Sequence, residues 1–238
     1  MSFRPRRRPD AADEPERPPL KAGTVTRLVQ QQKNTDRVSV YLDDAFAFGL
    51  TKDLSVTEGL RKGRALTVAE QEALLVRDEE LRARRKALDV LSYKARTSSE
   101  LRRKLRDTGF GEPAIEAAIA RMEELGYLDD AAYAHAYAKG RFSGRGYGPQ
   151  RIRSDLMKRG LDRRHIDAAL ADLAEPDDLV ETALRHGRKR WDRLASESDP
   201  RKRTKKTYDF LLRRGYGFDT ARRVVELLKE EDANRDDG

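Results

Sequence analysis

The segment SSELRRKLRDTGF, residues 98–110, decides the fold, because two later segments repeat its pattern. PQRIRSDLMKRGL occupies residues 149–161, and TKKTYDFLLRRGY occupies residues 204–216. Each segment places a leucine four residues before a glycine and an apolar residue directly after that glycine. The leucines are Leu105, Leu156 and Leu211, the glycines Gly109, Gly160 and Gly215, and the following residues Phe110, Leu161 and Tyr216. This pattern predicts a helix that stops at a left-handed glycine.

A second amphipathic helix is predicted after each glycine, because apolar residues recur six and ten positions later. These residues are Ile115, Ile166 and Ala221, followed by Ile119, Leu170 and Val225. The glycines are 51 and 55 residues apart, which leaves room for three helices per unit. We therefore expect a mainly α protein of tandem three-helix repeats in an elongated curved array, with a small N-terminal antiparallel β-segment. A coincidental set of helical hairpins is the alternative.

The region after residue 22 changes to a period of two, which is typical of strands. Alternating runs at residues 24–29, 38–42 and 46–50 are separated by turn-forming residues, among them Asp43-Asp44, so a small meander is predicted. Three short strands do not fold alone, and we expect them to pack on the helix that follows. Thr67 and Glu70 have the spacing of a capping box at the start of that helix.

These patterns divide the chain into seven parts. Residues 1–22 hold five of the nine prolines and many charges, which predicts a disordered tail. The other predicted parts are a β-meander at 23–51, a helical connector at 52–85, helical repeats at 86–129, 130–174 and 175–231, and a disordered end at 232–238.

The formal charge of +8 conceals a polarised distribution. Residues 84–109 carry nine basic and three acidic groups, residues 141–165 eight and two, and residues 185–214 twelve and four. Each of these basic windows contains the glycine-stopped helix of one repeat, and together they carry +20, which leaves −12 elsewhere. Equivalent helices of an array occupy corresponding places, so the windows predict one basic stripe that suits a polyanion or an acidic groove.

Two other causes also explain basic surface helices. Charged faces of such helices are ordinarily solvated, and cations near a helix C-terminus interact favourably with its dipole. Aromatic residues in the windows, namely Phe142, Tyr147, Trp191 and Tyr208, are candidates for base stacking, but at helical spacing they are more typical of a core.

Several chemistries lack their usual residues. The chain has no cysteine and no phosphate-binding Gly-Lys-Ser/Thr loop. The glycine-rich segment 140–148 is interpreted as a flexible basic loop, and the three histidines are too scattered for a metal site. The pairs Asp129-Asp130 and Asp177-Asp178 are expected to cap helices. We expect no enzyme activity, cofactor, metal or membrane span, and a cytoplasmic location.

The first two repeats resemble the RecX family of regulatory proteins. The resemblance rests on residues 92–105 followed by Gly109-Phe110, on Leu125-Gly126-Tyr127-Leu128-Asp129-Asp130, and on residues 146–153 followed by Leu156 and residues 158–161. It covers residues 86–173 in order. The third repeat fits less well, because it is longer and Thr207 replaces the apolar residue held by Leu101 and Ile152.

The resemblance implies a non-enzymatic modulator that lies in the groove of the RecA–DNA filament and suppresses its ATPase and strand exchange. We also expect a monomer. Expected partners are the RecA filament and DNA, single-stranded and also double-stranded. An independent, sequence-nonspecific DNA-binding or architectural protein remains the alternative. The candidate contact residues are Arg102, Arg103, Lys104, Arg106, Arg145, Arg151, Arg153, Lys158, Arg159, Arg201, Lys202, Arg203, Lys205 and Lys206.

Overall fold

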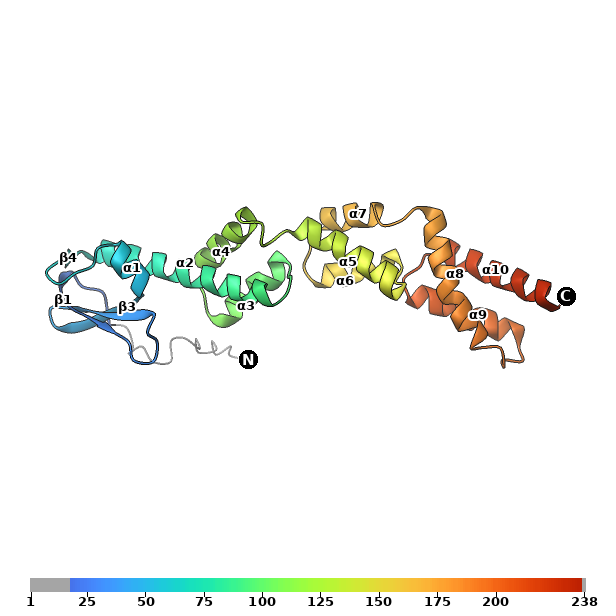
Figure 1. Cartoon of the computed structure of the whole chain (residues 1–238), viewed down its shortest axis with the longest axis horizontal. Helices are drawn as coiled ribbons and strands as arrows, with labels where there is room; N and C mark the ends of the chain where they lie inside the picture. The colour runs from blue at the N-terminus through green and yellow to red at the C-terminus, as the bar shows by residue number, and fades with distance from the viewer. Residues whose placement is uncertain (1–17, 237–238) are drawn as a thin grey trace. The chain divides into compact units, whose positions relative to one another are not determined.

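The computed structural model describes residues 18–236, without the side chains of Pro176, Arg235 and Asp236. It divides into two compact units. Unit 1 comprises residues up to 96 and residues 100–128, and unit 2 comprises residues 97–99 and everything from residue 129 onward. Most of the predicted tail, residues 1–17, lies outside the described residues. Figure 1 shows a small sheet at the start of unit 1 and helices through the rest of the chain.

A four-stranded antiparallel sheet begins unit 1. Its strands are β1 (Gly23–Gln30), β2 (Arg37–Leu42), β3 (Ala45–Thr51) and β4 (Ala65–Leu66), in the order β3-β2-β1-β4. Asp43 and Asp44 make the turn between β2 and β3 with positive φ angles of 47° and 66°, as the hairpin twist requires. The three predicted strands are thus confirmed. The short strand β4 was not predicted.

The sheet packs on α2 (Val68–Tyr93), which follows the short helix α1 (Lys52–Thr57). Leu74 of α2 joins the apolar cluster of the sheet. Asp78 of α2 is buried, and its carboxylate accepts hydrogen bonds from the Thr51 amide at 2.6 Å, Arg37 Nη1 at 3.2 Å and Arg82 Nε at 2.9 Å. A buried carboxylate therefore joins the sheet to the helix. The capping box of Thr67 and Glu70 at the start of α2 is confirmed.

Three helices complete each predicted repeat (Figure 1). In unit 1, the end of α2 packs with α3 (Ser98–Thr108) and α4 (Glu112–Glu124) around one apolar cluster. In unit 2, α5 (Asp130–Arg145), α6 (Pro149–Lys158) and α7 (Arg163–Ala171) enclose a second cluster. A third surrounds Trp191 between α8 (Pro176–Asp192), α9 (Pro200–Arg213) and α10 (Phe218–Asp236). The mainly α fold with three-helix repeats and a small N-terminal antiparallel sheet is confirmed.

The glycine stops have the predicted geometry in all three repeats. Gly109, Gly160 and Gly215 have φ angles of 99°, 75° and 89°, and we call them the cap glycines. The amide after each cap glycine donates to the carbonyl of the leucine before it, at 3.2–3.3 Å. This is the bonding of a Schellman motif, and the three leucines are fully buried.

The expected start of the first repeat, residue 86, lies inside α2. Three other local predictions differ from the structure. The expected loop at 140–148 is wrong for residues 140–145, because the buried Phe142 anchors that stretch in α5. Residues 232–236, expected to be disordered, belong to α10, where Asp232 accepts a hydrogen bond from Trp191 Nε1 at 2.8 Å. Asp129 caps α5 as expected, but Glu175 takes the N-cap position of α8.

Candidate polyanion interface

The basic residues of interest lie mainly on α3, α6 and α9, the helices that end at the cap glycines. Their apolar face, represented by Leu101 and Leu105 in α3, is fully buried. The intervening residues Arg102, Arg103 and Lys104 therefore project to the outside of the helix. Asp199 caps α9 through the amides of Arg201 and Lys202. The fold thus explains locally why each of these helices exposes cations.

Several predicted contact residues are engaged in ion pairs inside their own repeat. Arg102 binds Glu116 with two hydrogen bonds of 2.6 and 2.9 Å, and this guanidinium lowers the pKa of the Glu116 carboxyl. Arg106 binds Glu112 at 2.8 Å, and Arg153 binds Asp167. Each acidic partner lies on the next helix, outside the basic windows of the sequence. The local excess of positive charge is therefore smaller than the windows indicate.

The third repeat uses two of its predicted cations in the same way. Arg203 Nη1 lies 2.6 Å from Asp232, and its guanidinium stacks 4.2 Å from the ring centroid of Trp191. Lys206 pairs with Glu197, which lowers the pKa of that carboxyl. Trp191 itself is buried, so it belongs to the core and is unavailable for base stacking. These contacts give Arg203 and Lys206 structural roles.

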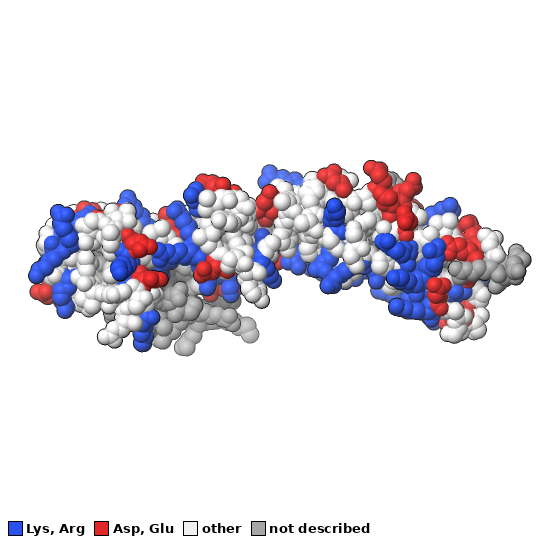
Figure 2. Space-filling model, viewed as in Figure 1, with Lys and Arg blue, Asp and Glu red and all other residues white. Residues whose placement is uncertain are grey.

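Most of the remaining candidates form no ion pair in the described part of the chain. Eight of the predicted contact residues form no salt bridge within 4 Å among residues 18–236, namely Arg103, Lys104, Arg145, Arg151, Lys158, Arg201, Lys202 and Lys205. Arg151 and Arg159 lie over the rings of Tyr147 and Tyr137 at 4.0 and 4.9 Å. Stacked guanidinium groups retain their charge. Figure 2 shows Lys and Arg side chains gathered on the part of unit 2 that carries α8 and α9.

A joint between the second and third repeats brings a set of these cations together. The Gly148 amide donates to the Arg214 carbonyl at 2.8 Å, and the Gln150 amide donates to the Gly215 carbonyl at 3.0 Å. Arg214 in turn donates to the carbonyls of Arg145 and Gly146. Main-chain bonds therefore place the end of α9 against the beginning of α6.

The electrostatic effect of this joint appears in two titratable groups. A hydrogen bond from Arg145, with the charges of Arg151 and Arg141, lowers the pKa of the Tyr147 phenol. Burial, with the charges of Arg214, Arg185 and Lys189, lowers the pKa of His186. After the hydrogen bond for Tyr147 and burial for His186, the charges of these cationic neighbours act in the same direction and lower the pKa of both groups. We call Arg141, Arg145, Arg151, Arg185, Lys189 and Arg214 the joint cluster.

Sequence reasoning identified Arg145 and Arg151 but missed the other four members of the joint cluster. Arg141, Arg185, Lys189 and Arg214 lie within the basic windows, yet only the docking of one repeat on the next makes them neighbours. Arg185 and Lys189 are one helical turn apart in α8, and both are exposed. Together the cluster offers guanidinium and ammonium groups that suit phosphates or carboxylates.

Other kinds of site find little support in the described part of the chain. Residues 18–236 contain no group of three or more His, Asp or Glu side chains that could hold a metal ion. None of the described helices combines the length and apolar character that crossing a membrane requires. Of the aromatic candidates, Phe142 is buried, whereas Tyr147 and Tyr208 are half-buried beside cations.

Comparison with known proteins identifies relatives along the chain. Family models match residues 23–67 as the regulatory protein RecX N-terminal domain, and 83–122, 129–170 and 177–225 as the first, second and third three-helix domains of RecX. A regulatory protein RecX from Clostridium perfringens (strain SM101 / Type A) is 31% identical over 207 residues, 87% of this chain and 96% of that protein.

Two solved structures are also similar. A crystal structure of regulatory protein RecX has a TM-score of 0.69 and 25% identity, and the match covers 86% of this chain and 99% of that one. The crystal structure of RecX from Lactobacillus salivarius has a TM-score of 0.60 and 28% identity over 64% of this chain and 97% of that one.

Proposed function

Because the chain belongs to the RecX family, we propose that it binds the RecA–DNA filament and inhibits RecA ATPase activity and strand exchange. The matches of four RecX family models within residues 23–225, together with a relative named regulatory protein RecX, carry this proposal. In this proposal the protein is a non-enzymatic cytoplasmic regulator that acts as a monomer.

The joint cluster supports the proposal physically. A filament presents DNA phosphates and protein carboxylates at regular intervals, and exposed cations on successive repeats match such a periodic partner. Several modest contacts made by one chain strengthen one another through effective concentration. If the bound protein prefers a filament state that is poor at hydrolysis, inhibition follows from that difference in affinity. Binding is expected to weaken as salt rises.

The decisive experiment titrates the protein into preformed RecA filaments on single-stranded DNA and measures ATP hydrolysis at fixed salt. The expected result is inhibition at well below one molecule per RecA subunit. The variant Arg145→Glu/Arg185→Glu/Lys189→Glu reverses three exposed cations of the joint cluster, none of which forms a salt bridge within the described residues. It should inhibit less.

A control variant reverses the charge of cations that lie outside the joint cluster. Arg61→Glu/Lys62→Glu reverses two exposed cations in the segment between α1 and β4 and should inhibit like the parent protein. The proposal would be rejected if the parent protein left ATP hydrolysis unchanged at saturation. Equal inhibition by the cluster variant and the parent would reject the role of the joint cluster alone.

The charge of the surface also favours the second candidate, an independent DNA-binding or architectural protein. That function requires equal affinity for bare DNA and for RecA-coated DNA. A strong preference for the filament would exclude it, and tight binding to bare DNA without inhibition would support it.

A further inference from the structure

One pair of equivalent positions distinguishes the third repeat from the other two. These positions lie seven residues before and seven residues after the cap glycine. In the first repeat this pair is Arg102 and Glu116, and in the second it is Arg153 and Asp167. Both pairs form ion pairs that join the two helices of the hairpin. The third repeat has Tyr208 and Arg222 at these positions. An aromatic ring and a cation therefore replace a neutralised pair.

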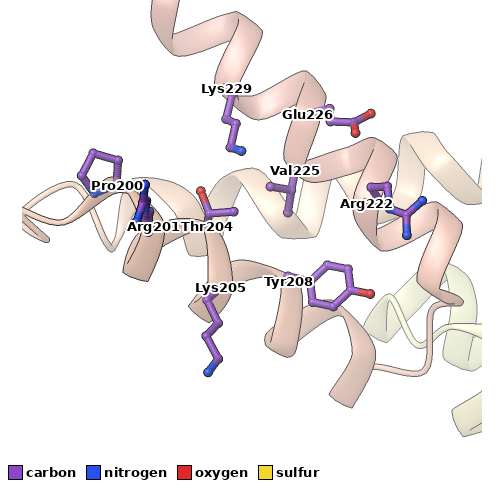
Figure 3. A pocket seen from close by; sticks show the side chains of 9 residues that line it. All are labelled: Pro200, Arg201, Thr204, Lys205, Tyr208, Arg222, Val225, Glu226 and Lys229. Atoms are coloured by element: carbon purple, nitrogen blue, oxygen red, sulfur yellow. The ribbon is translucent and has the colours of Figure 1, made fainter.

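The exchange coincides with a groove between α9 and α10, which we call the α9–α10 groove (Figure 3). It has a volume of about 480 Å³, within the range of small-ligand sites. Its base includes the buried Val225 and the half-buried Thr204 and Tyr208. The lining residues are Pro200, Arg201, Thr204, Lys205, Tyr208, Arg222, Val225, Glu226 and Lys229.

The rim of the groove is cationic on both walls. Arg201 and Lys205 project from α9, and Arg222 and Lys229 project from α10 (Figure 3). All four are exposed, and none forms a salt bridge within the described residues. Glu226 is the single carboxylate of the lining. The groove thus combines an apolar, aromatic base with four cations that form no salt bridge among the described residues, a chemistry that suits an anion with an apolar, planar part.

We propose that the α9–α10 groove binds one or two nucleotides of single-stranded nucleic acid, with a base against Tyr208 and the flanking phosphates on the rim cations. Bases and phosphates alternate along a single strand, and the groove offers one aromatic ring, Tyr208, together with cations on both of its helices. A duplex keeps its bases stacked on one another and cannot offer a base to this ring. The groove is present in the protein without RecA, so binding of a nucleic acid to it can be measured separately from inhibition of RecA.

The test uses the full chain and fluorescein-labelled dT12 and rU12, with fluorescence anisotropy as the readout. Tyr208→Ala should weaken binding of single strands between about fivefold and about 150-fold, the loss expected for one stacked base. Tyr208→Phe should retain the parent affinity, because stacking needs only the ring. Tyr127→Ala is the matched control, since Tyr127 is 60% exposed in unit 1 and should have no effect. The dT12 and rU12 arms show whether the groove prefers DNA or RNA.

A second variant restores the ion pair of the other repeats. Tyr208→Arg/Arg222→Asp copies the pair Arg153–Asp167 into the third repeat and should remove the site while keeping the hairpin folded, as circular dichroism would verify. An oligonucleotide with a central 2-aminopurine reports stacking directly, because its fluorescence falls when the base stacks. The parent protein should quench this signal, and the double variant should not.

Three results would overturn the proposal. One is the absence of 2-aminopurine quenching with the parent protein. Another is equal affinity of the parent, Tyr208→Ala and the double variant for both oligonucleotides. The third is a Tyr208→Ala variant that binds oligonucleotides normally but loses affinity for a labelled oligoglutamate peptide, which would identify an acidic protein segment as the ligand. None of these three results depends on a measurement of RecA ATPase inhibition.

Discussion

Gly148 provides a sharp test of the joint between the second and third repeats. It is the N-cap residue of α6, with φ −76° and ψ 164°, which alanine can adopt without strain. A Cβ at this position would lie 2.5 Å from the Tyr216 amide nitrogen and closer still to the Gly215 carbonyl. Main chain on the opposite side must therefore move if Gly148→Ala is to be accommodated.

The cost follows from the bonds that this movement breaks. The two main-chain hydrogen bonds of the joint, from Gly148 and from Gln150, are each worth about 1 kcal/mol. Alanine is also a poorer N-cap residue than glycine. Gly111→Ala measures that second effect alone, because Gly111 is the N-cap of α4 with φ −74° and ψ 154°. A Cβ there meets only the Glu79 carboxylate, at 3.5 Å.

We expect Gly148→Ala to lower the free energy of unfolding by about 2–3 kcal/mol more than Gly111→Ala. Urea unfolding followed by circular dichroism gives both values, and the fluorescence of Trp191, the only tryptophan, reports the third repeat. Hydrogen exchange should show that the Gln150 amide loses protection in Gly148→Ala and keeps it in Gly111→Ala. Equal stabilities, or a Gln150 amide that stays protected in both variants, would refute the reasoning.

Three further predictions concern single side chains. Thr207 is fully buried and its hydroxyl has no hydrogen-bond partner among the described residues, so Thr207→Val should raise the free energy of unfolding by about 1 kcal/mol and Tm by about 2–4 °C in calorimetry; an unchanged or lower Tm would contradict this. Asp78→Ala removes the carboxylate that binds the buried Arg37 and should cost about 3–5 kcal/mol, measured by urea unfolding, whereas a loss below about 1 kcal/mol would show that the ion pair does not hold the sheet to α2. The pKa of His186 is lowered in the folded protein, so its stabilising contribution is present above the unfolded pKa of about 6.5 and is lost as pH falls. The free energy of unfolding of unit 2 should therefore fall as pH is lowered from 8 to 5 in the parent protein, and it should depend less on pH in His186→Gln. Identical pH profiles of the two proteins would disprove the assignment.

The repeat architecture could be predicted because it depends on short-range apolar patterns. Leu105 and Phe110 fix the helix end around Gly109, and equivalent residues do so in the other repeats. Such a cap is determined by about six consecutive residues, so the sequence contains the whole signal. The length of α5 was harder to predict, because the buried Phe142 outweighs the glycines on either side of it.

The candidate site was predicted less well, because its properties depend on residues from different helices. Counting charges in windows could not show that Glu116 neutralises Arg102 from the next helix. The alignment around the cap glycines does contain that information, fourteen residues away, and it also shows Tyr208 and Arg222 as the exception. The joint cluster is different, since no local pattern places Arg214 beside Arg145.

The main-chain joint between the second and third repeats separates geometry from surface chemistry. Its main-chain bonds run from the Gly148 and Gln150 amides to the carbonyls of Arg214 and Gly215, and the side chains of Arg151, Arg214 and Tyr216 add bonds to main-chain carbonyls across the joint. Within the described residues, exposed side chains outside this set make no hydrogen bond or salt bridge across the joint. Substitution of exposed side chains can therefore change the surface charge of one repeat while the main-chain bonds of the joint stay in place. This independence gives the chain a route to acquire new ligands: one hairpin can exchange a neutral pair for an open groove while its neighbour stays in register.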